Sequence, residues 1–381
     1  MVGLWPPDNR DICKSIRPKF RLVYNFITLL FIATIPALAS LIRVWGNMIL
    51  MIDNLQYSLP TLMALFKISI IWYKQEALAS LTDMIRNDWI KMKMEEERVV
   101  MLKCATITRA LAICGVSILL GTFTSAFILP WFGLTTRQVT NLTDSGKPLL
   151  IQSYYFHDVS KSPQFELTLL AQGIVVLTGG VSYTAIDNFL GLLVLHVCGQ
   201  LENLHSRLTQ MEKYPNFIAV LKYNVQDHIR LIRGSYHCRS VQIIDDTFDL
   251  VLLGMIVCFG IMFCLQGFLI VNVAKQEGQF SFMQLIWFAA AILYTLLHMC
   301  LYCGVGEILV TQSERIHRAT YEYAWYTVEP KIAKNLLLIM LRSDNSLHIT
   351  AGKTFPMTMA TLCNLLKTSA GYISVLLAKQ E

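Results

Sequence analysis

The sequence predicts an all-α integral membrane protein with seven transmembrane helices. Hydrophobic residues make up 54% of its 381 positions and charged residues only 15%, which is too apolar for an ordinary soluble domain. Long uncharged runs recur along the chain, each long enough for one helix to cross a bilayer. These runs lack the alternation of a transmembrane strand, so helices and not a barrel are predicted.

Seven runs qualify as spans, and three of them contain one internal charge, at Lys67, Asp187 or Lys367. A further apolar patch at 336–341 is too short to cross and is expected to lead into the last helix. No cleavable signal peptide is visible ahead of the first span. The spans are expected at about 22–42, 55–73, 110–133, 167–198, 250–274, 282–306 and 355–378.

The distribution of positive charge predicts a cytoplasmic amino terminus and an extracellular carboxyl terminus. The segments expected inside carry 21 Lys and Arg residues, whereas those expected outside carry 5. A glycosylation sequon at Asn141 lies in 134–166, which the charge rule places outside. The inner segments are the amino-terminal arm, 74–105, 199–245 and 311–335, and the outer ones are 43–54, 134–166 and 275–281.

Helical periodicity continues beyond the spans on the cytoplasmic side. Apolar residues over 74–109 predict one long amphipathic helix, and span four runs on without a break into 200–213. The approach to span five, 217–246, is also helical in pattern. Such extensions need partners, so those of spans four to seven are expected to bundle as an anchor. We therefore expect a receptor body, residues 1–335, and a pore-forming terminal segment, 336–381.

The charges inside the spans and the longest outer loop invite functional interpretations. Lys67 lies about two turns from the inner end of its span and is expected to snorkel to the interface. Asp187 is expected at the inner boundary, and Lys367 is expected to contact another helix. The loop 134–166 either caps a cavity or is an ordinary surface loop.

No motif predicts catalysis, a cofactor or a nucleic-acid partner. Cys300 and Cys303 have metal-like spacing, yet both lie within span six without a histidine pair, so we interpret them as helix packing. No Gly-rich phosphate loop, zinc motif or Ser/His/Asp pattern occurs in a fitting context. The chain is therefore not expected to be an enzyme.

Polar residues of the last span fall on one stripe, because they recur at steps of three and four. The threonines either bond back to carbonyls of their own helix and pack on a neighbour, or form a wetted face that lines a pore. One helix cannot enclose a pore, so the second interpretation requires an oligomer. The stripe comprises Thr354, Thr358, Thr361, Leu365, Thr368, Tyr372, Val375 and Lys379.

Small and aromatic side chains in the outer halves of spans two, three, four and six are candidates for an apolar ligand pocket. Core packing is the alternative for each of them. The pattern does not identify the ligand, since apolar pockets discriminate by shape. The candidates are Leu62, Phe66, Gly121, Thr124, Ile128, Gly173, Leu177, Trp287, Ala291 and Tyr294.

A series of short motifs runs through the carboxyl-terminal third. They are Tyr302-Cys303-Gly304-Val305-Gly306-Glu307, Ser313-Glu314-Arg315, Ala319-Thr320-Tyr321-Glu322, Trp325-Tyr326, Thr354-Phe355, Leu366-Lys367-Thr368-Ser369, Gly371-Tyr372 and Val375-Leu376-Leu377. In this order they resemble the insect odorant receptor family. The seven spans, the inside amino terminus and the length extend the resemblance to the whole chain.

The resemblance implies an odorant-gated, non-selective cation channel in the plasma membrane of olfactory sensory neuron dendrites. It implies a small apolar odorant as ligand, surrounding membrane lipid, and a heterotetramer with the odorant receptor co-receptor. The last helix would line the pore, with Val375 at the gate and Thr368, Tyr372 and Lys379 along the same face. The chain lacks the co-receptor's long insertion between spans four and five, so it resembles an odorant-tuning subunit.

Lys379 departs from the family pattern, since an apolar residue is expected beyond the gate. Four ammonium groups around one axis would repel one another and entering cations, so we expect a homotetramer to conduct poorly. The alternatives are a G-protein-coupled or gustatory-type chemoreceptor and, third, a transporter. The predicted orientation, the missing Asp-Arg-Tyr and Gln-Phe motifs and the lack of an internal repeat disfavour them.

Overall fold

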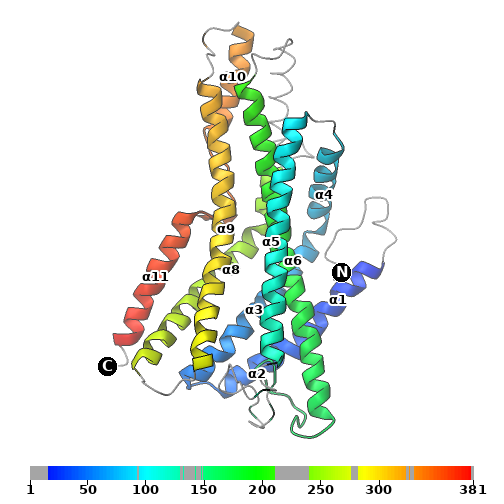
Figure 1. Cartoon of the computed structure of the whole chain (residues 1–381), viewed down its shortest axis with the longest axis vertical. Coiled ribbons are helices and arrows are strands. Elements are labelled where there is room, and N and C mark those ends of the chain that lie inside the picture. Colours follow the sequence, from blue (N-terminus) through cyan, green and yellow to red (C-terminus); the bar gives the residue numbers. More distant parts are fainter. Residues whose placement is uncertain are drawn as a thin grey trace.

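The computed structural model describes residues 16–91, 94–128, 149–210, 240–275, 282–322 and 330–378, with the single positions 132, 142, 147 and 326. These residues form an elongated helical body with a small two-stranded hairpin (Figure 1). Its elements are α1 (Ile16–Thr28), η1 (Leu29–Thr34), α2 (Ile35–Arg43), α3 (Met48–Tyr73), α4 (Gln75–Ile90), α5 (Glu95–Ile128), α6 (Gln164–Thr209), α8 (Ser240–Lys275), α9 (Phe282–Glu322), α10 (Pro330–Ser343), β1 (Thr350–Ala351), β2 (Phe355–Pro356) and α11 (Met359–Ala378).

Six helical stretches of the described chain are long and apolar enough to cross a membrane. They are Phe20–Arg43, Met48–Tyr73, Glu95–Ile128, Gln164–Thr209, Ser240–Val271 and Leu285–Glu322. α11 is the seventh, since its 20 residues span about 30 Å, the thickness of the hydrocarbon core. The predicted all-α fold with seven transmembrane helices is confirmed.

The first span is not one regular helix, because a π-helical segment, η1, separates α1 from α2. Pro36 has no amide hydrogen to donate to the carbonyl four residues earlier, Ile32. That carbonyl accepts a hydrogen bond from Tyr155 Oη at 2.7 Å, and the Pro36 carbonyl accepts one from the Tyr154 amide at 3.0 Å. The outer segment, defined here as residues 149–157, thus contacts the first span at the junction of η1 and α2.

The single amphipathic helix predicted over 74–109 is wrong, because the chain breaks between α4 and α5. Lys91 at the end of α4 has extended backbone angles, φ −60° and ψ 136°. α5 then begins with Glu95, Glu96 and Glu97, whose charges favour the positive end of a helix dipole. The acidic residues therefore favour the start of a new helix at Glu95.

The helices extend well past the membrane at one end of the molecule, the upper end in Figure 1. α6 has 46 residues and is about 69 Å long, more than twice the hydrocarbon thickness. Its far end packs with the extensions of α5 and α9, and α10 packs on α9. Span four therefore continues to Thr209 without a break, as predicted. The stretch 217–246 is described only from Ser240, the start of α8.

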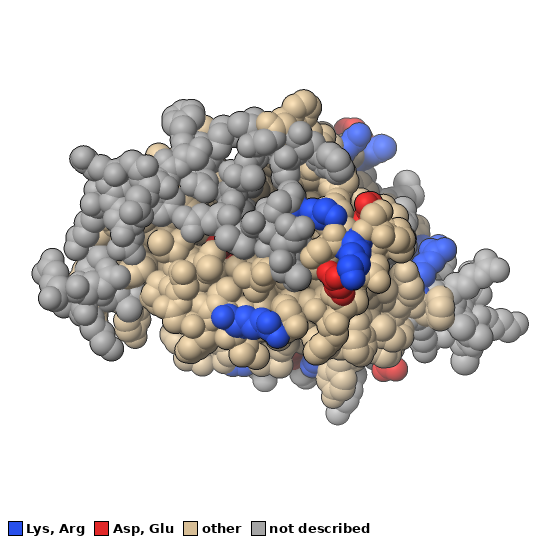
Figure 2. Space-filling view, turned by 90° about the horizontal axis from the view of Figure 1, so that it is seen from below, with Lys and Arg blue, Asp and Glu red and all other residues tan. Residues whose placement is uncertain are grey.

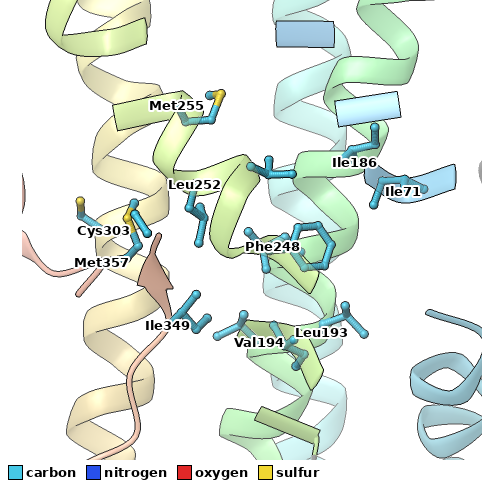
Figure 3. Close-up of a cluster of buried hydrophobic side chains, with 14 of the residues drawn as sticks. Ile71, Ile186, Leu193, Val194, Phe248, Leu252, Met255, Cys303, Ile349 and Met357 are labelled. Atoms are coloured by element: carbon cyan, nitrogen blue, oxygen red, sulfur yellow. The ribbon is translucent and has the colours of Figure 1, made fainter. Parts of the chain in front are cut away.

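The apolar core lies where α8 crosses α3, α6 and α9. Phe248, Leu252 and Met255 of α8 are almost fully buried, and Leu193 of α6 and Ile71 of α3 close around them (Figure 3). Figure 3 also shows Met357 beside Cys303 and Ile349 near Val194, so the residues that flank the hairpin belong to the same core. The opposite, lower end of the molecule shows only scattered charged side chains among its described residues (Figure 2).

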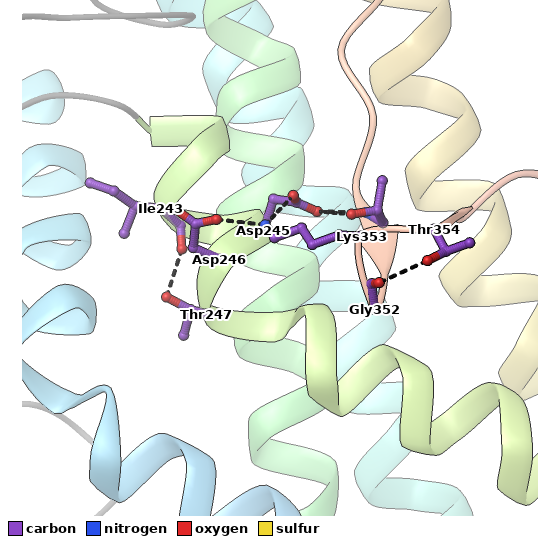
Figure 4. A network of polar contacts seen from close by, with 8 residues as sticks. Ile243, Asp245, Asp246, Thr247, Gly352, Lys353 and Thr354 are labelled. Carbon is purple, nitrogen blue, oxygen red and sulfur yellow. Dashed lines mark hydrogen bonds and ion pairs between the residues drawn. The ribbon is translucent and has the colours of Figure 1, made fainter.

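A hairpin, and not the 336–341 patch, leads into the last helix. β1 pairs with β2 in antiparallel register, and the Asp245 carboxylate accepts hydrogen bonds from Thr350 and from Lys353 Nζ (Figure 4). The predicted start of the last span at residue 355 is therefore too early, since Phe355 and Pro356 form β2. Thr354 lies in the turn and does not share the helical face of α11.

Candidate functional site

A cluster of charged and aromatic groups is buried between three spans. Lys67 of α3 has 0% exposure, and its Nζ lies 2.5 Å from Oδ1 of Asp187 on α6. His298 Nε2 on α9 lies 3.0 Å from Oδ2 of the same carboxylate, and Tyr302 Oη donates to Oδ1. The prediction that Lys67 snorkels is therefore wrong, because its ammonium is buried against Asp187, whereas the depth of Asp187 in the membrane stays a prediction.

Aromatic rings surround this cluster, which we call the charge cluster (Lys67, Asp187, His298 and Tyr302). The Lys67 ammonium lies 3.3 Å from the ring centroid of Tyr183, a cation–π contact. The His298 ring stacks on Tyr302 at 5.3 Å and meets the edge of Tyr294 at 5.5 Å. A buried charge is costly unless it is paired and hydrogen-bonded, and these groups satisfy that requirement.

The spacing of polar aromatic residues in the sequence is a signal for the charge cluster. Tyr294, His298 and Tyr302 recur every four residues, so they share one face of α9. Tyr183 and Asp187 have the same spacing on α6. Polar aromatics repeated at helical spacing inside a span indicate a buried partner on a neighbouring helix.

The outer segment is anchored on α3 and α6, and Asn54 Nδ2 of α3 donates to the Gln152 carbonyl at 3.3 Å. Gln172 of α6 is fully buried, and its Oε1 accepts hydrogen bonds from the amides of Leu150 and Ile151. Its Nε2 donates to Ser153 Oγ and to Tyr155 Oη, each at 2.9 Å. The described part of the loop 134–166 is thus inserted among the helices, which favours the cap over an ordinary surface loop.

Three of the ten candidate ligand residues lie near these two features. Gly173 faces Leu150 of the outer segment, whose Cδ1 would be 3.6 Å from an added Cβ. Tyr294 lies one helical turn from His298, and Phe66 adjoins Lys67 in the sequence and lies against Gly254 of α8. A contribution of α8 to this region was not predicted from the sequence.

The remaining candidates are more dispersed. Gly121, Thr124 and Ile128 lie on exposed parts of α5, and the Thr124 hydroxyl donates to Leu120 of its own helix at 2.8 Å. Leu62 is partly exposed on α3. Leu177, Trp287 and Ala291 are half-buried on α6 and α9.

The last helix packs on the body by one face. Leu362 and Ser369 of α11 are buried, and the Ser369 carbonyl lies 3.9 Å from Cys264 Sγ on α8. The Ile373 side chain occupies the space beside Gly267 of α8. In Figure 1 the red α11 accordingly lies at the edge of the molecule beside α8.

The hydroxyl stripe of α11 is partly bonded back to its own chain and partly uncovered. Thr368 Oγ1 donates to the Asn364 carbonyl at 2.8 Å, and Thr361 Oγ1 donates to that of Pro356. Tyr372 and Val375, however, are 61% and 65% exposed. Lys367 is also exposed, so a contact with another helix remains a prediction. Lys379 and Asn141 lie outside the described residues.

The family model and the curated relatives that match this chain are all odorant receptors. The family model described as 7tm Odorant receptor matches residues 47–370. Odorant receptor 10 of Aedes albopictus is 28% identical over 228 residues, which cover 58% of this chain and 57% of that protein. Odorant receptor Or2 of Anopheles gambiae is 25% identical over 224 residues, 58% of each chain. The matches thus span less than three fifths of these relatives.

A solved structure has the same fold over almost the entire chain. The olfactory receptor OR5 of Machilis hrabei, in complex with eugenol, superposes with a TM-score of 0.80 and 16% identity. The match covers 99% of this chain and 94% of that one. The arrangement of helices described above is therefore that of a known insect receptor.

Proposed function

The chain belongs to the insect family of seven-transmembrane odorant receptors, and on that premise we propose that it is a subunit of an odorant-gated, non-selective cation channel. The amino terminus lies in the cytoplasm and the carboxyl terminus outside, in accord with the excess of Lys and Arg in the predicted inner segments. The protein resides in the plasma membrane of olfactory sensory neuron dendrites. Asn141 is its proposed glycan site.

The observation that carries the proposal is the one-sided packing of α11. Its buried face rests on α8, whereas Tyr372 and Val375 on the stripe remain largely exposed in the single chain. A transmembrane helix that presents hydroxyls and an uncovered aliphatic residue suits a channel axis shared by several subunits. Val375 is the proposed gate, with Thr368 and Tyr372 lining the pore.

The working assembly is a heterotetramer with the odorant receptor co-receptor, in which this chain is the odorant-tuning subunit. Lys379 would place an ammonium group near the gate of each copy, so a homotetramer would concentrate positive charge in the cation path. Mixing with another subunit type dilutes that charge. The terminal segment 336–381 forms the pore, and residues 1–335 form the receptor body.

The odorant, a small apolar molecule, binds between the outer segment and the charge cluster. The outer segment bounds this region at Gly173, and the charge cluster bounds it at Asp187, about 21 Å farther along α6. Small and aromatic side chains dominate the proposed lining, as in other apolar ligand pockets. The lining comprises Leu62, Phe66, Gly121, Thr124, Ile128, Gly173, Leu177, Trp287, Ala291 and Tyr294.

Odorant-evoked current in cells that express this chain with and without the co-receptor tests the proposal. A panel of volatile ligands is applied under G-protein block. The channel proposal predicts currents in the co-expressing cells that persist under the block and little current from this chain alone. Currents that vanish under the block would instead indicate a G-protein-coupled chemoreceptor, and strong currents from this chain alone would contradict the Lys379 argument.

A further inference from the structure

A groove of about 390 Å³ lies between the first span and α6, apart from the proposed odorant site. Residues 21–32 of α1 and η1 form one wall, and residues from 171 to 178 of α6 form the other. None of the ten candidate odorant residues lines it. Both walls are membrane-spanning helices, and Tyr24 and Ile174 on them are 59% and 52% exposed, so the groove opens on the surface of the single chain.

The groove is polar at one end and apolar at the other. Arg21 lies at the end where the span begins, is exposed, and forms no ion pair with any described residue. Asn25, one turn further in, donates from Nδ2 to Ser182 Oγ at 2.7 Å, while its buried Oδ1 has no hydrogen-bond partner among the described residues. Beyond it the lining becomes apolar, with Ile32 and Ile174.

Two threonines line the groove, but their hydroxyls do not make its apolar end polar. Thr28 Oγ1 donates to the Tyr24 carbonyl at 2.9 Å, and Thr178 Oγ1 donates to the Ile174 carbonyl at 2.9 Å. Since both hydroxyls are satisfied within their own helices, an alkyl chain can pack on them without leaving them unpaired.

The length of the groove matches one leaflet of a bilayer. The eleven steps along the helix from Arg21 to Ile32 rise about 16 Å, close to half of the hydrocarbon thickness of about 30 Å. Phe20 and Tyr24 are exposed beside Arg21, as aromatic side chains are at a membrane surface. The groove therefore runs from the membrane surface on the amino-terminal side to near the midplane.

We propose that this groove is a binding site for an anionic glycerophospholipid, with the phosphate at Arg21 and one acyl chain along α6 toward Ile32. Guanidinium groups bind phosphate oxygens by charge-assisted hydrogen bonds. Arg10, Lys14, Arg17 and Lys19 precede Arg21 in the sequence, and the cytoplasmic leaflet carries the anionic lipids.

Photolabelling of the full-length protein in phosphatidylcholine nanodiscs tests the proposal without any odorant. The probe is phosphatidylserine with a photoactivatable acyl chain, and labelled peptides are mapped by mass spectrometry. Labels are expected on residues 24–32 and 171–178. Arg21→Gln is expected to lower this labelling about five-fold, the effect of one basic residue at an anionic surface.

Two further variants separate binding from folding. Arg43→Gln changes an arginine at the opposite end of the same span and is expected to leave labelling unchanged. Ala171→Trp fills the groove with Arg21 intact and is expected to abolish labelling, with size-exclusion profile and melting temperature confirming the fold. Equal labelling by a phosphatidylcholine probe, or labelling that survives both Arg21→Gln and Ala171→Trp, would overturn the proposal. So would displacement of the probe by an odorant, which would make the groove an odorant site.

Discussion

The Lys67 ammonium and the Asp187 carboxylate meet at 2.5 Å inside the helix bundle, although 120 residues separate them along the chain. The contact joins α3 to α6, and His298 and Tyr302 extend it to α9. The Lys67 side chain is fully buried, and that of Asp187 is 14% exposed. The pair therefore fixes the mutual placement of three spans around the proposed odorant site.

Replacement of one partner of this pair should lower the free energy of unfolding far more than replacement of both. Lys67→Met leaves the Asp187 carboxylate buried without its cation, and such loss typically destabilises a protein by about 3–5 kcal/mol. The double variant Lys67→Met/Asp187→Leu replaces the pair by apolar groups and should recover most of that loss. Melting temperatures of the purified receptor in detergent measure both. A double variant as unstable as the single one would contradict the pairing.

Gly306 on α9 should be intolerant of a side chain. A Cβ there would lie 2.0 Å from the carbonyl oxygen of Met357, just ahead of α11. Backbone cannot yield as a flexible side chain does, so Gly306→Ala should separate α9 from the start of the last helix and abolish surface expression. Gly304→Ala is the matched control, because an added Cβ meets nothing within 4 Å. It should gain about 0.5–1 kcal/mol from helix propensity.

Asp245 should matter more to the hairpin than its neighbour Asp246. The Asp245 carboxylate accepts from the Thr350 amide at 2.6 Å, the Thr350 hydroxyl at 2.8 Å and Lys353 Nζ at 2.6 Å. Of these three donor groups, the Asp246 carboxylate contacts only Lys353 Nζ, and the Asp246 side chain is half-exposed. We expect Asp245→Ala to cost about 3 kcal/mol and Asp246→Ala less than about 1 kcal/mol. Chemical denaturation in detergent distinguishes them, and equal losses would count against the hairpin contact.

Acid should weaken the packing between the extensions of α6 and α9 through His205. Burial, and then the nearby Arg315 guanidinium, lower the pKa of His205 below its ordinary value of 6.5. The folded state therefore binds the proton less well than the unfolded state, so stability is full above pH 6.5 and falls as the pH drops through that value. A melting temperature measured from pH 7.5 to 5.5 should decline less in His205→Gln than in the wild type. Identical profiles would show that His205 is not the group responsible.

The membrane architecture was predictable because the bilayer imposes it. A run of uncharged residues such as 250–274 has no stable alternative to a buried helix, and α8 accordingly covers it. The break at Lys91 was missed because apolar periodicity continues on both sides of it. The acidic triplet from Glu95 to Glu97 marked the new helix start more reliably than that periodicity.

The interior of the site was harder to predict, because it depends on which helices meet. Taken alone, the position of Lys67 in its span is compatible with snorkelling. Its ammonium can be buried because the Asp187 carboxylate on a neighbouring helix pairs with it and offsets the desolvation penalty. The insertion of the outer segment depends on Gln172, a single polar residue in an apolar run. By contrast, residue spacing placed Tyr372 and Val375 on one stripe of the last helix, and both are exposed there, while the pore-lining role of that stripe stays a prediction.

Cysteine accessibility on α11 tests the central claim that its exposed face lines a pore. Val375→Cys and Tyr372→Cys are co-expressed with the co-receptor, and a charged thiol reagent is applied from outside during odorant-evoked current. Ser369→Cys on the buried face serves as the matched variant, and the unmodified channel controls for the exposed Cys363. We predict that current falls in Val375→Cys and Tyr372→Cys but not in Ser369→Cys or the unmodified channel. Current that is unaffected at Val375 and Tyr372, or blocked only at Ser369, would contradict the account.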